Sequence, residues 1–520
     1  MSRRLKILTG AGIALGLAIL LPIVHHYQLR FAVQKYISEL KAKGEPMELA
    51  QVIPSPVPTE LNYTALFTNA AALLDTNQNV LWTNSPPVAH GVAPGKTMIG
   101  WAQSQVCDLG NRGPTNSWAD INDALARENG ALDLLRKLTA ESLFDFNQNY
   151  QNGFTNLKLS PLTQGKKAAQ RLAAATMADL HRADTAAATT NILAMQSLVH
   201  GFTHDRLLIS ELVRIAIAQI TEAATWEFLQ STNATDTQLA ALQRGWTNLE
   251  FIQPFENSMN IERVGGRIEL ARLRKTGVES YFDTFNELGL FGNRENSWDH
   301  LKIKYKSLIW RYWWSYPDEL RDLQGIQATL EAARQFLTNY SFIEGDAALK
   351  RQFVTLTVNP DNSDSDFWFT DPAKANFHYI ASSSLPAFER AFDKVMKVET
   401  ARQLAIAAIV LKRYQLKHGN YPPDLKSLVP EFVPAVPRDP VDGQPLRYRL
   451  NADGTFLLYS VGENGKDDGG SPEWEKTDET QHASPNYSNW QNAHALDWVW
   501  PQPATAEEIQ KYYAQHPNSR

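Results

Sequence analysis

Oxygen-bearing side chains gather near the carboxyl end of the chain. Residues 463–479 contain seven acidic residues and two lysines, a net charge of −5, so the stretch repels itself unless a cation is bound. Hard cations take six to eight oxygen ligands, and Asn464, Asp467, Asp468 and Asp497 can supply several of them beside backbone carbonyls. We therefore predict a metal site at these four residues. The alternative is a solvated turn of Asp, Asn and Gly, which needs no ligand.

No other pattern in the chain indicates catalytic chemistry. The sequence lacks Gly-x-Ser-x-Gly, His-Glu-x-x-His, a phosphate-binding loop and Cys-x-x-Cys. Ser38 and Lys41 have the spacing of a Ser-x-x-Lys pair, but we expect them on an exposed helix face. His200 and His204 lie four residues apart, as two metal ligands on one helix would, yet no third ligand is evident. We name no catalytic residue, and the sequence favours a protein that is not an enzyme.

The composition excludes several classes of protein. A chain of 520 residues is too long for one hydrophobic core, so we expect several domains. The 50 basic and 56 acidic residues nearly balance, and we expect no nucleic-acid partner. Hydrophobic residues make up 43% of the chain, which excludes a disordered protein. The single cysteine, Cys107, excludes an intrachain disulfide framework and a zinc site built from several thiolates.

The amino terminus predicts a membrane anchor. Arg3, Arg4 and Lys6 precede an uncharged, mostly apolar run over residues 7–24, which as a helix spans about 27 Å and so nearly matches a hydrocarbon core. The cations before the run favour a cytoplasmic amino terminus and an extracytoplasmic body. No small-x-small pattern follows the run, so we expect an uncleaved anchor; a cleaved signal peptide is the alternative. An amphipathic stalk and a Pro-rich spacer complete the predicted segment 1–58.

Residues 59–384 predict a helical body. Ala-rich segments with helical apolar spacing, joined by short polar links, indicate antiparallel helices in a bundle or an irregular solenoid. Residues 75–116 are rich in Asn, Pro and Gly, and there we expect an irregular loop. Glu211 and Arg214 lie in an apolar helix, which favours buried ion pairs with neighbouring helices; a polar cleft is the alternative.

The densest aromatic cluster is Trp310-Arg-Tyr-Trp-Trp-Ser-Tyr316. Trp310, Trp313 and Trp314 share a helical face by their i, i+3, i+4 spacing, which favours burial in the core. The alternatives are a stacking platform for a sugar or peptide and a contact with the membrane interface.

Residues 385–520 predict a small α+β module. A long helix fits residues 385–418 and ends at a Gly-Asn carboxyl cap. Residues 446–450 alternate, turn at Asn451-Ala-Asp-Gly454 and return as residues 456–460, which indicates a β-hairpin. The expected fold is therefore mainly α, with an amino-terminal membrane helix, an α-helical bundle or solenoid body and this α+β module.

A series of short motifs follows in this module, namely Arg413-Tyr414, His418-Gly-Asn-Tyr-Pro422, Pro437-Arg-Asp-Pro440, Tyr448 and Tyr459-Ser-Val-Gly462. Over residues 398–500 their order resembles the soluble domain of the major pseudopilin of type II secretion. The resemblance implies a long helix packed on a small antiparallel sheet, and a carboxyl-terminal loop that binds one Ca²⁺. Asn464 stands where that family has an Asp, and Asp497 matches the family's later Asp. A long insertion separates Asp468 from Asp497 here.

The chain departs from that family at its amino end. Its predicted anchor lies far upstream of the long helix, and residues 10–21 contain no Glu, so we do not expect assembly into a pilus shaft. The helical body with this tail also resembles uncharacterised envelope proteins of planctomycete and verrucomicrobial type, which implies a location but no activity.

These patterns together predict a location more firmly than an activity. We expect a single-pass protein of a bacterial inner membrane, held through residues 7–24 with the bulk of the chain in the periplasm. The predicted role is protein interaction, or a secretion-associated function, with other envelope proteins as partners. The alternative is an extracytoplasmic hydrolase or glycan-binding protein with a cleft near residues 310–316. The sequence does not predict an oligomeric state.

Overall fold

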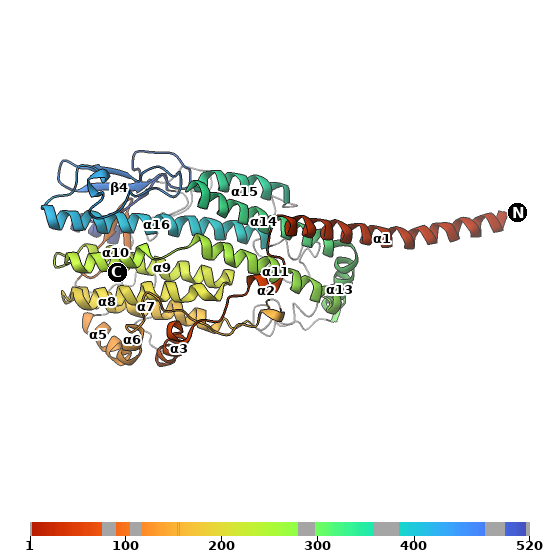
Figure 1. Cartoon of the computed structure of the whole chain (residues 1–520), viewed down its shortest axis with the longest axis horizontal. Helices are drawn as coiled ribbons and strands as arrows, with labels where there is room; N and C mark the ends of the chain where they lie inside the picture. Colours follow the sequence, from red (N-terminus) through yellow and green to blue (C-terminus); the bar gives the residue numbers. More distant parts are fainter. Residues whose placement is uncertain are drawn as a thin grey trace.

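A long projecting helix and an elongated body of stacked helices make up the molecule (Figure 1). The computed structural model describes residues 3–74, 90–103, 117–152, 154, 157–278, 297–356, 384–473 and 495–515, and among these the side chains of residues 3–19, 21–22, 297–300 and 302–303 are not described. The described chain is mainly helical, which confirms the predicted class. In chain order its α-helices are α1 (Arg3–Ala42), α2 (Leu49–Val52), α3 (Thr64–Leu73), α5 (Trp118–Arg127), α6 (Asn129–Leu135), α7 (Ser160–His181), α8 (Thr185–Gly201), α9 (Leu208–Leu229), α10 (Asp236–Thr247), α11 (Ile252–Thr276), α13 (Ser297–Ile309), α14 (Ser315–Asn339), α15 (Phe342–Leu356), α16 (Leu385–His418) and α17 (Ala506–Gln515).

Helix starts in the body follow local capping chemistry. The side chain of Asp184 accepts a hydrogen bond from the amide of Ala187 at 3.0 Å and begins α8. Thr235 and Gln238 form a reciprocal capping box that begins α10, with the Thr235 amide donating to Gln238 Oε1 at 2.9 Å. These caps satisfy amide groups that a helix start leaves without intrahelical partners. Both helices therefore begin directly after the residue that caps them.

Small side chains let the central helices approach one another closely. α7, α8 and α9 pack together in pairs, and α7 presents buried alanines on several sides. On α9, Arg214 is fully buried, pairs with Glu211 and donates to the carbonyl of Val199 at 2.8 Å. The two charges are therefore buried as expected, but they pair with each other within α9, and Arg214 reaches the neighbouring α8 through a backbone carbonyl.

Two small sheets lie at the carboxyl end. β3 (Arg447–Leu450), β4 (Phe456–Ser460) and β5 (Trp498–Val499) form an antiparallel sheet that packs on α16. β1 (His90–Ala93) and β2 (Lys96–Met98) form a hairpin, and β2 pairs in parallel with β6 (Gln502–Pro503). The expectation of an irregular loop over residues 75–116 is therefore wrong at this hairpin, because a strand more than 400 residues later supplies its pairing partner. Residues 75–89 and 104–116, with Cys107, lie outside the described residues.

One hydrophobic core joins the helical body to the carboxyl-terminal module. It runs from Phe67 on α3 to Trp500, just after β5. α16 lies at its centre, because this helix contacts α9, α10 and α14 on one side and β4 on the other. The predicted boundary at residue 385 is the first residue of this shared helix. A cut there would remove Leu404, Ile409 and their neighbours from the core of the body.

The aromatic cluster divides between core and surface. Residues 310–314 form a π-helical segment, η4 (Trp310–Trp314), between α13 and α14. Trp310 is fully buried and its indole donates to Asp318 at 3.1 Å, whereas Tyr312 and Trp313 are 54% and 44% exposed. The prediction of burial is right for Trp310 and wrong for Trp313, and Trp314 is half-buried. The wider π turn separates side chains that an α-helix would place on one face.

α1 continues without a break from Arg3 to Ala42, and its first part extends away from the body (Figure 1). Its later residues Val33, Ile37 and Leu40 are buried against Leu323 on α14. Within the residues that the structure describes, no helix is long and apolar enough to cross a membrane. The backbone of the predicted span, residues 7–24, belongs to α1, but of its side chains only those of Leu20, Ile23 and Val24 are described.

Candidate functional site

The predicted metal residues lie in and beside the turn-rich loop that follows β4. Asn464 donates from its amide to the Asp468 carboxylate at 2.9 Å, and its own oxygen accepts from the Lys466 amide at 2.9 Å. Asp468 is exposed, and Asn464 is half-buried. Because the side chain of Asn464 is used within the loop, this pair closes a local turn.

Asp467 faces the sheet instead of the other predicted ligands. Its carboxylate accepts from the Tyr459 hydroxyl at 2.9 Å and from the Gly469 amide at 3.0 Å, and Arg447 lies 3.6 Å away. The hydrogen bond from the Gly469 amide, followed by that from Tyr459, lowers the pKa of Asp467. Asp467 therefore fixes the loop to β3 and β4.

Asp497 is fully buried and holds the other side of the loop. One of its oxygens accepts from the amides of Gly470 and Ser471 at 2.9 and 3.0 Å, and the other lies 3.4 Å from the Asp468 amide. Burial raises the pKa of Asp497, while these amides oppose the shift. The carboxylate thus receives donors from the backbone of residues 468–471, which holds this part of the loop against Asp497.

The four predicted residues therefore do not converge on one point. The structure joins Asn464 to Asp468, brings Asp497 to the loop backbone, and turns Asp467 toward Tyr459. Among the described residues, no group of three or more His, Cys, Asp or Glu side chains is placed to hold a metal ion. As arranged here, the donor set does not fit a calcium shell. Calcium binding stays a prediction that needs the loop to rearrange.

Sequence reasoning missed the residue that organises this module, Asp439. It is fully buried, and its carboxylate accepts from the amides of Val441 and Val461 at 3.0 Å each and from the Ser460 hydroxyl at 2.8 Å. Arg447 donates to the same carboxylate at 3.2 Å. Burial raises the pKa of Asp439 to about 6, although these hydrogen bonds oppose the shift. Its position between two prolines in Pro437-Arg-Asp-Pro440 was the only signal.

A mixed charge cluster connects the loop to α15 and α16. Glu463 lies 3.3 Å from Lys397 and 4.0 Å from Lys350, and Lys350 also pairs with Asp346 at 2.9 Å. Burial, and then the charge of Glu463, raise the pKa of the nearby Asp393 to about 6. Two cations thus lie among three carboxylates, so this cluster holds the loop against the helices.

At the other end of the body, Glu45 joins the end of α1 to α11 and α14. Arg263 donates to it at 2.9 Å, Gln327 donates at 3.0 Å, and Arg334 pairs with the same carboxylate. Burial would raise the pKa of Glu45, but the hydrogen bonds from Arg334, Gln327 and Arg263 outweigh it and lower that pKa to about 2. Like Asp439, this ion cluster was not predicted from the sequence.

A cleft of about 550 Å³ opens near the carboxyl end of α8. Its lining includes His200, Glu141 and Glu250, and none of the residues 310–316. The cleft expected near residues 310–316 stays a prediction. Burial, with the nearby charge of Arg214, lowers the pKa of His200. His204 lies 3.9 Å from Asp145 and does not line this cleft. The described residues therefore offer one His and two carboxylates to a small ligand there.

Ser38 and Lys41 carry no chemistry together. Ser38 donates to the carbonyl of Gln34 at 2.9 Å, and Lys41 pairs with Glu48 at 2.8 Å; Ser38 and Lys41 are both exposed. The expected exposed helix face is confirmed.

Comparisons with known protein families, with curated proteins and with solved structures found no match. The resemblance of the carboxyl-terminal module to a pseudopilin therefore stays a prediction. The function is argued below from the geometry of the chain itself.

Proposed function

We propose that this chain is a single-pass protein of a bacterial inner membrane that displays a pseudopilin-like module in the periplasm for interaction with other envelope proteins. The observation that carries the proposal is the division of α1 into two parts. Its later part is buried in the body, while its first part, with the uncharged run 7–24, extends free of it (Figure 1). A free apolar helix of this length is unfavourable in water and matches the thickness of a bilayer.

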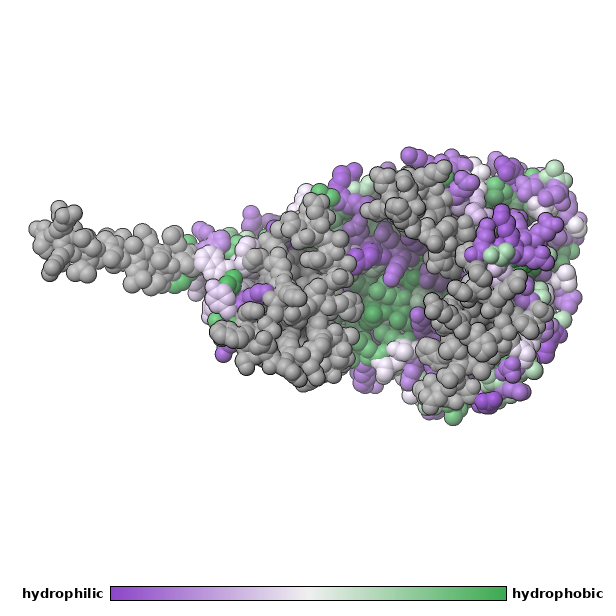
Figure 2. Space-filling view, turned by 180° about the vertical axis from the view of Figure 1, so that it is seen from behind, coloured by the Kyte–Doolittle hydropathy of each residue, from purple (hydrophilic) through white to green (hydrophobic). Residues whose placement is uncertain are grey.

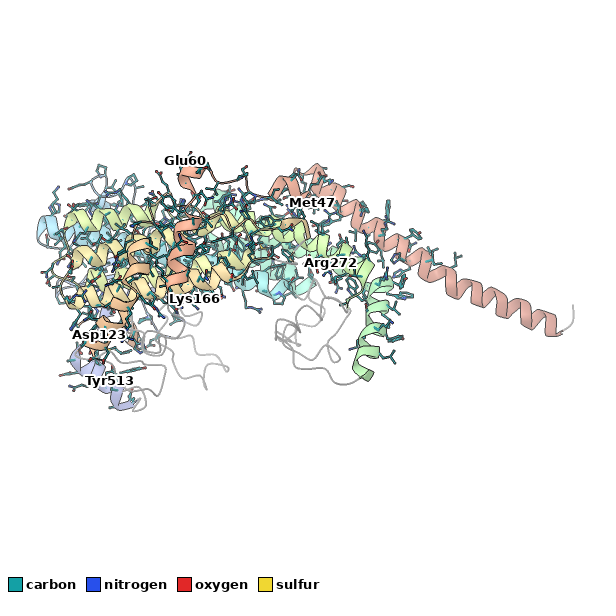
Figure 3. All side chains as sticks on the ribbon, turned by 90° about the horizontal axis from the view of Figure 1, so that it is seen from below. Met47, Glu60, Asp123, Lys166, Arg272 and Tyr513 are labelled. Carbon is teal, nitrogen blue, oxygen red and sulfur yellow. The ribbon has the colours of Figure 1, made fainter. Side chains whose placement is uncertain are left out.

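The contacts between α1 and the body are those expected of an anchor that holds the body in a fixed orientation. Val33, Ile37 and Leu40 are buried, and Glu45 pairs with Arg263 and Arg334 immediately after the helix. Met47 lies where the chain turns back along the body (Figure 3), and its carbonyl accepts from Arg267 at 2.9 Å. Since these contacts leave no flexible linker between α1 and the body, the direction of α1 sets the direction of the whole protein.

The position of the carboxyl-terminal module makes it accessible to other proteins. β4 and its neighbouring loop lie at the end of the body opposite to the projecting part of α1 (Figure 1). Lys466, Asp467 and Asp468 are exposed there. In a protein anchored through α1, this loop is therefore far from the bilayer and open to partners.

Two measurements on the full chain test the proposal. The tagged protein, expressed in bacteria, should stay in the membrane pellet after alkaline carbonate; extraction into the supernatant would contradict the anchor. A photo-crosslinking amino acid at Lys466 should then give protein adducts that the same probe at Lys426, exposed at the start of η6 (Leu425–Leu428), does not give. The absence of adducts from Lys466 would contradict the interaction role. The full chain is needed because a truncation at residue 398 would remove buried residues of α16.

A second candidate function follows from the cleft beside α8. Its His200, Glu141 and Glu250 side chains could bind a glycan or act on an extracytoplasmic substrate. Titration of soluble peptidoglycan fragments into the purified protein would test it. A heat of binding that is lost in His200→Ala favours this candidate, and no heat in either protein contradicts it.

A further inference from the structure

An exposed apolar stripe follows α13 into η4. Leu301, Tyr305 and Leu308 are spaced i, i+4 and i+7, so they lie along one face of α13, and Tyr312 follows them in η4. Their exposed fractions are 57%, 65%, 48% and 54%, and Trp313 beside them is 44% exposed. Large apolar side chains gathered on one exposed face mark a surface that binds something.

The opposite side of this segment is fixed to the body. Ser307 is buried and accepts from the Val278 amide at 3.0 Å, and the buried Trp310 donates to Asp318. The orientation of the helix is therefore set by packing, and the stripe faces away from the core.

The stripe lies beside the point where the apolar run of α1 ends. The rings of Trp313 and His25 are 5.7 Å apart, and His26 Nδ1 lies 2.9 Å from the carbonyl oxygen of Tyr312. On α1 itself, Tyr27 and Phe31 are 61% and 71% exposed. Weakly polar and hydrophobic side chains gather where α1 meets the body (Figure 2). The stripe is thus continuous with the predicted membrane segment.

The direction of α13 matches a contact with a surface. α13 lies at the end of the body from which α1 projects, and it runs across the direction of α1 rather than along it (Figures 1 and 3). If α1 enters a bilayer, α13 lies beside the plane of that bilayer. Tyr and Trp residues favour this interfacial depth, where an apolar ring and a polar edge are both accommodated.

The charges of the segment also suit lipid headgroups. Residues 297–314 contain four cations, Lys302, Lys304, Lys306 and Arg311, and one acid, Asp299. Amphipathic helices that lie on membranes combine such cations with an apolar face of Trp, Tyr and Leu. A second copy of this chain would carry the same excess of positive charge, so like charges would oppose a contact between two stripes.

We propose that α13 and η4 lie in the headgroup region of the bilayer that α1 enters, with the stripe facing the acyl chains. The inference rests on the proposed membrane anchor and adds a second, interfacial contact. Two contacts that do not lie on one line fix the tilt of the body against the membrane. The module at the far end is then held at a defined height.

Fluorescence of the full chain in liposomes with and without anionic lipid tests this contact. In a Cys107→Ser background, an environment-sensitive dye is attached to Tyr305→Cys or, as the matched control, to Leu416→Cys. Leu416 is 43% exposed and lies near the end of α16, by the carboxyl-terminal module. For the dye at position 305 we expect a blue-shifted emission and quenching by doxyl groups attached to the lipids. For the dye at position 416 we expect quenching by iodide in the water instead.

Flotation of the same liposomes separates the possible failures. If the protein floats but the dye at position 305 responds to iodide as strongly as the dye at position 416, the interfacial contact is overturned and the anchor stands. A third result is possible, in which the emission of the dye at position 305 is blue-shifted but is not quenched by the doxyl groups, and the protein cross-links to a second copy through this position. The stripe then joins two copies, and the proposal is overturned. If the protein does not float, the anchor and the contact that rests on it are both overturned.

Discussion

Two buried carboxylates, Glu45 and Asp439, stabilise opposite ends of the molecule, and they differ in their hydrogen-bond partners and in the direction of their pKa shifts. Glu45 faces the guanidinium groups of Arg263 and Arg334, and its pKa is lowered to about 2. Asp439 faces mainly amides and a hydroxyl, and burial raises its pKa to about 6. The shifts are opposite because Asp439 is the more completely buried of the two and has one guanidinium partner, Arg447, whereas Glu45 keeps 7% exposure and has two guanidinium partners.

The largest expected effect comes from removing the charge at the α1 end. Glu45→Ala leaves Arg263, which has no exposed side-chain surface, without its carboxylate. Removal of one partner from a buried ion pair lowers the free energy of unfolding by about 3–5 kcal/mol. Chemical denaturation of the solubilised full chain measures the loss. Glu48→Ala, which removes the exposed partner of Lys41, is the matched control and should change little; equal losses in the two variants would contradict the comparison.

At the module end, Asp439→Ala should destabilise less. The change leaves the amides of Val441 and Val461 without an acceptor, so we expect a loss of about 2–4 kcal/mol. Hydrogen exchange of the β4 amides would locate the loss. Protection unchanged at β4 would show that Asp439 does not organise the module.

The dependence on pH should have opposite signs at the two ends. The pKa of Glu45 is about 2 in the folded protein, below its ordinary value, so its contribution of about 3 kcal/mol is present above pH 4.5 and is lost as the pH falls toward 2. The pKa of Asp439 is about 6, above its ordinary value, so protonation stabilises the fold as the pH falls from 7 to 5.

Unfolding curves of the two variants at several pH values test these signs. The difference between the native chain and Glu45→Ala should shrink below pH 4. That between the native chain and Asp439→Ala should grow between pH 7 and 5. The same trend in both variants would contradict the assigned partners.

The exposed loop should contribute least to stability and most directly to calcium binding. Asp468→Ala removes an exposed carboxylate whose partner is Asn464, and we expect a change within about 0.5 kcal/mol. Isothermal titration with millimolar calcium compares this variant with the native chain, and Asp453→Ala, in the exposed hairpin turn, is the control. A heat of binding that is lost only in Asp468→Ala supports the predicted site. No heat in the native chain would show that the loop is held by its hydrogen bonds alone.

Local patterns predicted the elements of this fold well. The spacing of apolar and capping residues predicts helices over residues 184–202 and 235–249, and α8 and α10 begin at Thr185 and Asp236, within one residue of those positions. The hairpin of β3 and β4 also lies within one residue of its predicted strands. Capping side chains and turn residues act within a few residues of themselves, so the sequence carries their signal directly. The same reasoning failed for β1 and β2, whose third strand comes from residues 502–503.

The candidate site was predicted less well than the elements. Asn464, Asp467, Asp468 and Asp497 do meet at one loop, as the sequence indicated, but they face different partners there. Spacing along the chain shows which oxygens are near one another. It does not show which hydrogen-bond donors those oxygens accept from in the folded protein. At Asp497, the carboxylate accepts hydrogen bonds from the backbone amides of the loop itself.

The sequence by itself determined the helical class, the ends of the long helix over residues 385–418 and the uncharged run at the amino terminus, because each depends on residues close in the chain. Only the tertiary structure decided what these elements touch. It placed Glu45 on Arg263, 218 residues further along, and put Asp439 beneath β4. It also left Tyr312 and Trp313 exposed while burying Trp310 against Asp318. These outcomes depend on which surfaces meet after folding, and no local spacing encodes that choice.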